Sequence, residues 1–397
     1  MNVAAHSSLL GMARGSARGT SVHLDWVTLA LTLATLLLGL VMVTSASVSI
    51  ASQETGQPFY YLERQLLLTL IGAACALLVF SIRTELLERI SVALLALAIV
   101  LLVVVLIPGL GHVVNGSRRW LRLAGVNFQV SELSRMLVLI YLASYAVRRE
   151  SELRSSLAGL AKPVGLLVAA GALLLAEPDF GAATVLFATG FGLLFLAGAR
   201  LRYVIALTAI ACAGFGVLAV SSSYRLRRLT AFLDPWADPY NSGFQLTQSL
   251  IAIGRGQWLG VGPGDSVQKL FYLPEAHTDF LFAVLAEELG LLGVVVTLGL
   301  FLALVWRSFH IARLASEAGL KFPAYLAGGF GLWVGIQALI NIGVNMGVLP
   351  TKGLTLPFMS YGRSSLIVAL AWVGLLLRVY HEAVRGQRGS ATVRGGA

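Results

Sequence analysis

The chain has 397 residues, of which 57% are hydrophobic and only 12% are charged, and its formal net charge is +10. This composition excludes an ordinary soluble domain, because many apolar stretches are long enough to cross a bilayer core of roughly 30 Å. No soluble basic segment is present that would bind nucleic acid, so the positive charge points to anionic lipid. Cys75 and Cys212 lie inside apolar runs and indicate neither a disulfide framework nor a metal site.

Apolar windows predict an all-α polytopic membrane protein with about ten transmembrane helices. The first window is longer than the core of a signal peptide, so we expect it to be retained as a span. The predicted spans cover residues 24–47, 61–81, 86–107, 132–148, 160–176, 180–198, 201–220, 279–307, 322–347 and 362–383.

An even number of spans places both termini on one side of the membrane. With both ends in the cytoplasm, nearly all Lys and Arg residues of the short connecting loops fall inside, as the positive-inside rule requires. The tails 1–23 and 384–397 are rich in Gly, Ser and Arg and are expected to be disordered, flanking a transmembrane domain at 24–383. Residues 221–278, between the seventh and eighth spans, then form a large extracytoplasmic loop.

Three clusters of basic residues remain on the outer side, which the positive-inside rule disfavours. A long loop translocates whatever its charge, so a single such residue carries little weight. Together the clusters favour an outward-facing site for a phosphate-bearing ligand, because Arg and Lys donate charge-assisted hydrogen bonds to phosphate oxygens. They consist of Arg118, Arg119 and Arg122, of Arg225, Arg227, Arg228, Arg255 and Lys269, and of Lys352 with Arg363.

Residues 109–130 read as neither a span nor an ordinary loop. Cationic and apolar residues are interleaved around Trp120, which is typical of an amphipathic segment lying at the membrane interface. Glu132 and Arg135 follow at a spacing of three residues, so they can meet on one helix face. They form either a buried ion pair or, since intramembrane charge is costly, part of a functional site.

Two turn-rich segments have structural explanations that compete with functional ones. Between the fifth and sixth spans, Pro178 and Gly181 explain a turn that carries Glu177 and Asp179. Asp179 is placed to cap the next helix, and binding of a cation or a sugar is the alternative. The glycines between residues 254 and 264 superficially resemble a phosphate cradle, but their spacing matches no phosphate-binding loop.

Asp279 stands where the long polar loop turns into the eighth span, and we expect it to act as a catalytic base at the membrane surface. In the structural alternative Thr278 caps the helix, and the helix dipole lowers the pKa of Asp279 in the first turn, whereas burial would raise it. His277 is the competing base, because imidazole titrates nearer neutrality. Deeper in the span, Glu287 and Glu288 indicate either a structural polar contact or a proton pathway.

Residues 350–365 join the last two spans. Their prolines, glycines and hydroxyl side chains predict irregular backbone that lines a cavity rather than facing lipid. Lys352 adds a cation to the same outer region.

These segments resemble the SEDS family (shape, elongation, division and sporulation) of polytopic membrane proteins, over residues 24 to 383. Residues 269–272 and 350–353 are more similar to the cell-division members than to the elongation members. Three positions depart from the usual pattern: Arg363 stands where Gly is more frequent, Arg135 where Lys is common, and Glu177 where Gln is frequent. The motifs that carry the resemblance lie at 119–120, 129–133, 178–179, 232–235, 243–245, 273–290 and 345–365.

The resemblance implies a peptidoglycan glycosyltransferase of the bacterial inner membrane, placed at the division septum. It would polymerise lipid II, an undecaprenyl-diphosphate-linked disaccharide peptide, beside a class B penicillin-binding protein transpeptidase and other divisome membrane proteins. Asp279 matches the family's essential aspartate, and Lys352 and Glu132 match further functional positions. The complete set of expected substrate-binding residues is Lys352, Glu132, Arg119, Lys269, Glu275, His277 and Ser360.

One carboxylate with several cations is the inventory that this reaction needs. A base removes the proton of the acceptor 4-hydroxyl, while the diphosphate leaves as an anion and is stabilised electrostatically. A glycosidase would instead need two carboxylates flanking the bond. No cofactor motif or dedicated metal cage is evident, and Mg²⁺ or Mn²⁺ would assist the diphosphate if such a cation binds.

Two other functions share these sequence features. A lipid II flippase would use the same anionic-lipid site but needs a polar route through the bundle, for which Glu287 and Glu288 are candidates. A non-enzymatic divisome scaffold would use the outer loops only to recruit partners.

Overall fold

The computed structural model describes residues 22–114, 117–123, 126–220, 231–351 and 353–394. Lys352 and Arg225, Arg227 and Arg228 therefore lie outside the described residues. The elements are α2 (Trp26–Thr55), α3 (Tyr60–Ser81), α4 (Thr84–Arg89), α5 (Ser91–Leu106), β1 (Gly111–Val114), β2 (Ser117–Leu123), β3 (Val126–Gln129), α6 (Val130–Arg148), α7 (Glu150–Ser155), α8 (Leu157–Ala176), α9 (Phe180–Leu196), α10 (Leu201–Val220), η2 (Pro235–Ala237), α12 (Phe244–Gly256), α13 (Leu281–Glu317), α14 (Lys321–Asn345) and α15 (Arg363–Arg394).

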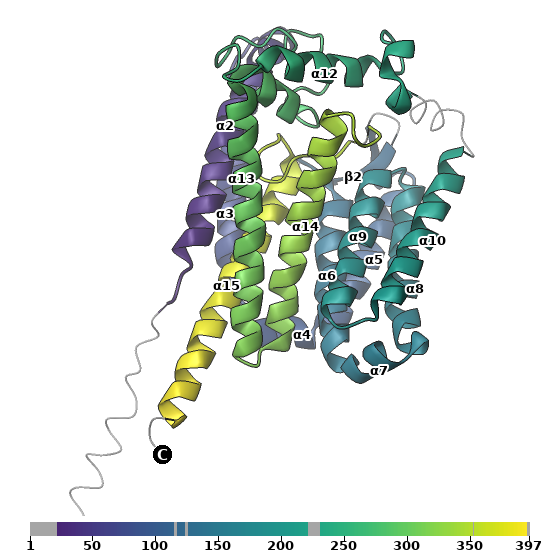
Figure 1. Ribbon diagram of the computed structural model, residues 1–397, viewed down its shortest axis with the longest axis vertical. Coiled ribbons are helices and arrows are strands. Elements are labelled where there is room, and N and C mark those ends of the chain that lie inside the picture. Colours follow the sequence, from purple (N-terminus) through teal and green to yellow (C-terminus); the bar gives the residue numbers. More distant parts are fainter. Residues whose placement is uncertain (1–21, 115–116, 124–125, 221–230, 352, 395–397) are drawn as a thin grey trace, which may run out of the picture.

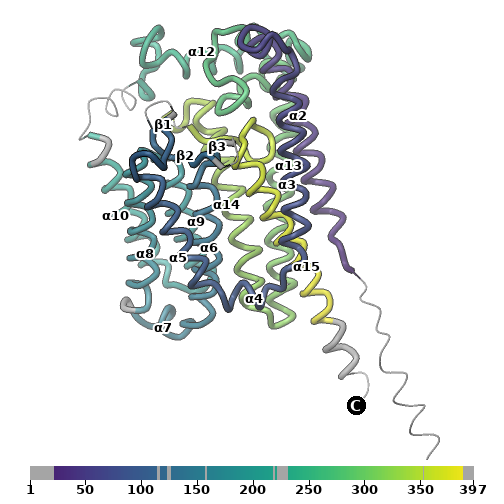
Figure 2. The backbone as a smooth tube through the Cα atoms, turned by 180° about the vertical axis from the view of Figure 1, so that it is seen from behind, coloured from purple at the N-terminus to yellow at the C-terminus, as the bar shows by residue number. Residues whose placement is uncertain are grey.

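The long helices run roughly side by side, and α12 lies across one end of them (Figures 1 and 2). We call this the α12 end, and the opposite end, where α4 and α7 lie, the α7 end. Seven helices of the described chain, α2, α3, α6, α8, α13, α14 and α15, are long and apolar enough to cross a membrane, and α5, α9 and α10 are shorter apolar helices. The polytopic helical class is confirmed, and the count of ten spans stays a prediction.

The segment around Trp120 is a small antiparallel sheet in the order β1–β2–β3. Its interleaved residues follow the period of a strand, in which successive side chains point to opposite faces. Leu121 and Phe128 pair across β2 and β3, and both pack against the hydrophobic core. The sheet thus holds its cationic strand β2 against the bundle.

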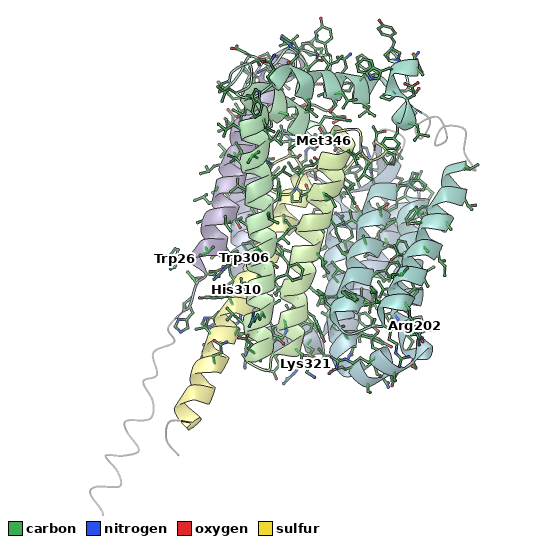
Figure 3. The ribbon with its side chains drawn as sticks, in the orientation of Figure 1. Trp26, Arg202, Trp306, His310, Lys321 and Met346 are labelled. Carbon is green, nitrogen blue, oxygen red and sulfur yellow. The ribbon has the colours of Figure 1, made fainter. Side chains whose placement is uncertain are left out.

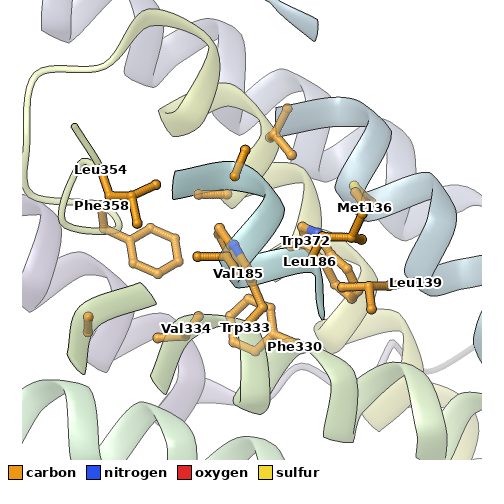
Figure 4. Packing of buried hydrophobic residues seen from close by; sticks show 14 of the residues in the cluster. Met136, Leu139, Val185, Leu186, Phe330, Trp333, Val334, Leu354, Phe358 and Trp372 are labelled. Carbon is orange, nitrogen blue, oxygen red and sulfur yellow. The ribbon is translucent and has the colours of Figure 1, made fainter. Parts of the chain in front are cut away.

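The core is packed by aromatic side chains of α14 and α15. Trp333 and Trp372 stack with ring centroids 6.2 Å apart, and Phe330 lies against both, as the close view in Figure 4 shows. Phe358, from the segment between α14 and α15, belongs to the same cluster (Figure 4). Because this segment is buried at its middle, its two ends are held in fixed positions at the α12 end.

Helix α13 is broken at Gly290, whose φ of 62° lies in the left-handed region. The break frees the carbonyls of Glu287 and Glu288, which accept hydrogen bonds from Val261 N (2.9 Å) and Gly262 N (3.2 Å) of the long loop. The glycines of this loop therefore allow close backbone packing on α13, and they do not form a phosphate cradle.

Charged and aromatic side chains mark the α7 end. Asp25 caps α2 and forms an ion pair with Arg307 of α13 at 2.6 Å. Figure 3 shows Arg202 and Lys321 near this end and Met346 near the other.

Helix α13 continues to Glu317, beyond the predicted limit at 307, because a helix can extend past its apolar window with exposed polar residues.

Candidate active site

A cavity of about 1020 Å³ opens at the α12 end of the bundle. Its walls come from strands β2 and β3, the turn before α9, the segment before α13 and the segment before α15. Among the described residues, the acidic and basic side chains that line it are Arg119, Glu132, Asp179, Glu275, Asp279 and Arg363.

Asp279 is held by its backbone, which leaves its carboxylate to face the cavity. Helix α13 begins two residues later and has no side-chain cap, so the expected Thr278 cap is not formed. Thr278 instead donates to the Glu275 carboxylate at 2.7 Å. The carbonyl of Asp279 accepts from Asn341 Nδ2 at 2.9 Å and from Asn345 Nδ2 at 3.1 Å.

Burial raises the pKa of Asp279 to about 7, and the negative charges of Glu275 and Asp179 act in the same direction, whereas Arg119 lowers it. The shift is in the direction expected from burial, which was one of the two effects considered from the sequence. A carboxyl group with a pKa near neutrality can exchange a proton at physiological pH, which is the property of a general base.

Asp179 anchors the neighbouring wall. It caps α9 by accepting from Ala182 N at 3.0 Å, as the sequence suggested. Its other oxygen accepts from Gln129 Nε2 (3.1 Å) and Ser131 Oγ (3.0 Å), and Arg119 Nη1 lies 3.7 Å away. This carboxylate ties β3, α6 and α9 together and orients Arg119 of β2 at the cavity surface.

Glu132 and Arg135 form the ion pair that their spacing allowed, and both are buried. Glu132 lines the cavity, while Arg135 also donates to Gln337 of α14 at 3.2 Å. The pair therefore lies at the cavity wall and connects it to α14.

Glu177 is fully buried beside this site, and neither carboxylate oxygen has a hydrogen-bond partner among the described residues. Burial, aided by the negative charge of Asp179, raises its pKa to about 9, although Arg119 opposes the shift. Glu177 is therefore protonated at neutral pH and adds no charge to the cavity.

His277 lies outside the cavity lining, packed between the rings of Tyr61 (4.6 Å between centroids) and Tyr361 (5.7 Å). Burial lowers its pKa, so the imidazole is neutral at physiological pH. Its carbonyl accepts from Tyr361 N at 3.0 Å and so joins the Asp279 segment to the segment before α15. Glu275 does line the cavity and has a positive φ of 57°.

Besides His277, two further residues expected to bind substrate lie outside the cavity lining. Lys269 is buried in an ion pair with Glu288 (2.7 Å) and also donates to Ser45 Oγ and Gly264 O, because the long loop folds back onto α13. Ser360 is buried, and its hydroxyl accepts from Leu356 N at 2.9 Å within its own turn. Neither lines the cavity.

Arg363 supplies the second cation of the cavity wall. It is the first residue of α15, and no ion pair of its side chain is found within the described residues.

Next to the cavity lies a wholly apolar groove of about 230 Å³ between α8, α9 and α10, and the two spaces share Leu175 and Phe215. A polar head and an apolar tail can thus be accommodated side by side.

The amide side chains that support this site were not predicted from the sequence. The apolar helix α14 carries an amide every four residues, at Gln337, Asn341 and Asn345. This spacing was a usable signal in the sequence, because polar side chains inside a membrane need partners.

No group of three or more His, Cys, Asp or Glu side chains that would hold a metal ion occurs in the described ranges.

The chain is similar to proteins of the FtsW, RodA and SpoVE family. The model of the FtsW, RodA and SpoVE family, described as cell cycle protein, matches residues 25–385. The chain is 57% identical to a probable peptidoglycan glycosyltransferase FtsW of Thioalkalivibrio sulfidiphilus, over 89% of this chain and 88% of that protein. It is 55% identical to a protein of the same name from Nitrosococcus halophilus, over 92% of this chain and 94% of the relative.

Solved structures give the same result. One chain, from a study of the structural coordination of polymerization and crosslinking by a peptidoglycan synthase complex, is similar with a TM-score of 0.74 and 32% identity, over 91% of this chain and 99% of its own. The rod shape determining protein RodA of Thermus thermophilus has a TM-score of 0.67 and 29% identity, over 91% of this chain and 98% of its own.

Proposed function

The chain belongs to the cell cycle protein family of FtsW, RodA and SpoVE, and from this membership and the cavity we propose that it is a peptidoglycan glycosyltransferase. Its substrate is lipid II, which it polymerises into β-1,4-linked glycan strands during septal wall synthesis. Asp279 is the general base.

One observation carries the proposal: a carboxyl group whose pKa is about 7 shares a large cavity with two arginines. Arg119 and Arg363 supply positive charge for a diphosphate, and the adjoining apolar groove suits a polyprenyl chain. This combination fits a lipid-linked sugar diphosphate better than a free sugar, which would need no cations and no apolar groove.

In the proposed reaction Asp279 accepts the proton of the acceptor 4-hydroxyl as that oxygen attacks the anomeric carbon of the donor. The new carbon–oxygen bond forms while the bond to the diphosphate breaks, and the diphosphate leaves as an anion stabilised by the arginines. Asp279 then returns the proton to water.

The proposal includes a location and partners. The basic loops of the α7 end support a cytoplasmic position for that end and for both termini, which leaves the cavity on the outer face of the inner membrane. A class B penicillin-binding protein transpeptidase would crosslink the strands, in keeping with the synthase complex that contains a similar chain. Other divisome membrane proteins would complete the assembly.

Labelled lipid II tests the proposal directly. The purified protein, with and without its transpeptidase, should convert lipid II into glycan strands resolved on a gel, and Asp279→Asn should form none. Strands made at the normal rate by a folded Asp279→Asn protein would exclude Asp279 as the base.

A flippase is the second candidate, but both carboxylates considered for its polar route are paired with basic side chains. Glu287 pairs with Arg255 at 3.1 Å and accepts from Ser266 at 2.5 Å, while Glu288 pairs with Lys269. These contacts fix the long loop to α13 and give both carboxylates a structural role. A reconstituted translocation assay separates the two functions, because transport leaves lipid II chemically unchanged. A scaffold would neither polymerise lipid II nor translocate it.

A further inference from the structure

Three amide side chains form a line along α14, which we call the amide ladder: Gln337, Asn341 and Asn345. Their spacing of four residues places them on one helix face, and all three are buried. Buried amides need hydrogen-bond partners, and each of these finds a backbone group outside α14.

The upper part of the ladder holds the segment that carries Asp279. Asn341 and Asn345 both donate to the carbonyl of Asp279, at 2.9 and 3.1 Å. Asn345 Oδ1 also accepts from Ala283 N at 3.2 Å, in the first turn of α13. The backbone on both sides of Asp279 is therefore attached to α14.

The lower part of the ladder holds the cavity wall that adjoins Asp279, at Leu354 and Thr355. Asn341 Nδ2 also donates to the carbonyl of Leu354 at 2.5 Å, and Gln337 Nε2 donates to that of Thr355 at 3.0 Å. Leu354 and Thr355 both line the cavity, as does Asp279. A single amide, that of Asn341, thus contacts both walls.

We propose that the amide ladder is a positioning device, which sets the distance between the Asp279 carboxylate and the wall at residues 353–355. This inference rests on the proposed function. The ladder residues contact backbone groups and act through Asp279, so they are positioning residues and not catalytic ones.

The chemistry of the amides supports this role. An amide is neutral, so it fixes a carbonyl without placing a charge beside Asp279, whereas Lys or Arg would lower the pKa of the base. An apolar side chain of similar size at position 341 would remove the amide donor to the buried carbonyl of Leu354 and leave Asn345 as the amide donor to that of Asp279. Of the polar side chains, Asn also has a short stem with few rotatable bonds, which suits it to fixing a backbone segment.

The test compares Asn341→Ala with Thr297→Val in the full-length protein with its transpeptidase. Thr297 is also buried in a spanning helix, but its hydroxyl only donates within α13, to Gly293 O. Asn341→Ala should lower kcat for lipid II by about tenfold to a hundredfold with little change in KM, because a small displacement of the base is costly. Thr297→Val should retain the wild-type kcat.

A pH profile distinguishes positioning from a general loss of stability. When its segment is released, the Asp279 side chain becomes better hydrated, so the acid limb of kcat should move to lower pH in Asn341→Ala and stay in place in Thr297→Val. If the kcat and the acid limb of Asn341→Ala match those of Thr297→Val, the ladder is not a positioning device.

Asn345→Ala provides a second variant should Asn341→Ala not fold. It removes one of the two donors to Asp279 and the acceptor for Ala283 N, so hydrogen exchange in residues 275–283 should accelerate relative to Thr297→Val. Unchanged exchange would refute the attachment. Absence of glycan strands in the wild-type reaction would instead refute the proposed function, and the exchange measurement would still decide whether the ladder holds this segment.

Discussion

Gly353 faces Asp279 so closely that a methyl group at residue 353 would stand 2.9 Å from Asp279 Oδ2. Any side chain at this position would need space that the carboxylate occupies.

Gly353→Ala should therefore slow glycan polymerisation, by about tenfold, because the added methyl group displaces the carboxylate from its place. Gly299→Ala in α13 is the matched control, since a methyl group there meets nothing within 4 Å. Initial rates with labelled lipid II measure the difference. Equal rates for the two variants would contradict a role for this contact.

The rate should depend on pH with a midpoint near 7. Burial raises the pKa of Asp279 to about 7, and a general base works only when deprotonated, so activity should fall as the pH drops through that value. The profile of kcat against pH, at saturating lipid II, is the measurement. A midpoint near 4 would show that an ordinary, hydrated carboxyl group is responsible.

Asp279→Asn should be more stable than the wild type in alkaline solution. The folded-state pKa of Asp279 is raised from 3.8 to about 7, so the wild type loses stability as the pH rises from 4 through 7, while the amide does not titrate. Tm values in detergent at pH 4 and pH 8 should show a gap between the proteins only at the higher pH. A gap of the same size at pH 4 would point to a different cause.

Arg363→Gly should raise the KM for lipid II about tenfold and weaken its dependence on salt, because one cation in contact with the diphosphate is lost. Arg363→Lys, which keeps the charge, should retain most of the affinity. Arg313→Ala removes an exposed arginine that pairs with Glu317 and serves as the control. An unchanged KM in Arg363→Gly would place Arg363 outside the diphosphate site.

Lys269→Met should destabilise the protein, by about 3 kcal/mol, and leave the KM for lipid II unchanged. The change leaves Glu288 buried without its cation. The double variant Lys269→Met, Glu288→Gln should recover part of the lost Tm, because no charge is then left unpaired. A higher KM without a fall in Tm would return Lys269 to the substrate site.

The helices were predictable because their apolar windows are long, and Tyr60–Ser81 and Phe180–Leu196 begin within a residue of the predicted limits. The sheet around Trp120 was not recognised, since its strands are short and their alternation is brief. The end of α13 at Glu317 could not be predicted from hydropathy, because its last residues are polar and exposed.

The candidate site was predictable only in part. Asp279, Arg119 and Glu132 all line the cavity. Asp279 and Glu132 were predicted because each places a charge at the border of a predicted span. Arg119 was predicted because it belongs to a basic cluster on the outer side. Lys269 also belongs to a basic cluster on the outer side. Its ion pair with Glu288 depends on how the long loop folds back onto α13, which no local sequence pattern indicates. The amides of α14 act on backbone carbonyls, and such contacts depend on tertiary packing alone.

The break at Gly290 has a consequence for how related sequences should vary. Loop and helix meet there through main-chain atoms, and a methyl group at Gly256, Gly260 or Gly290 would come within 1.8, 2.0 or 2.3 Å of the facing backbone. Substitution should therefore be forbidden at these three glycines, although none of them lines the cavity. Insertions and deletions between α12 and the break should be equally rare, because one added residue would shift the register of every bond across the junction.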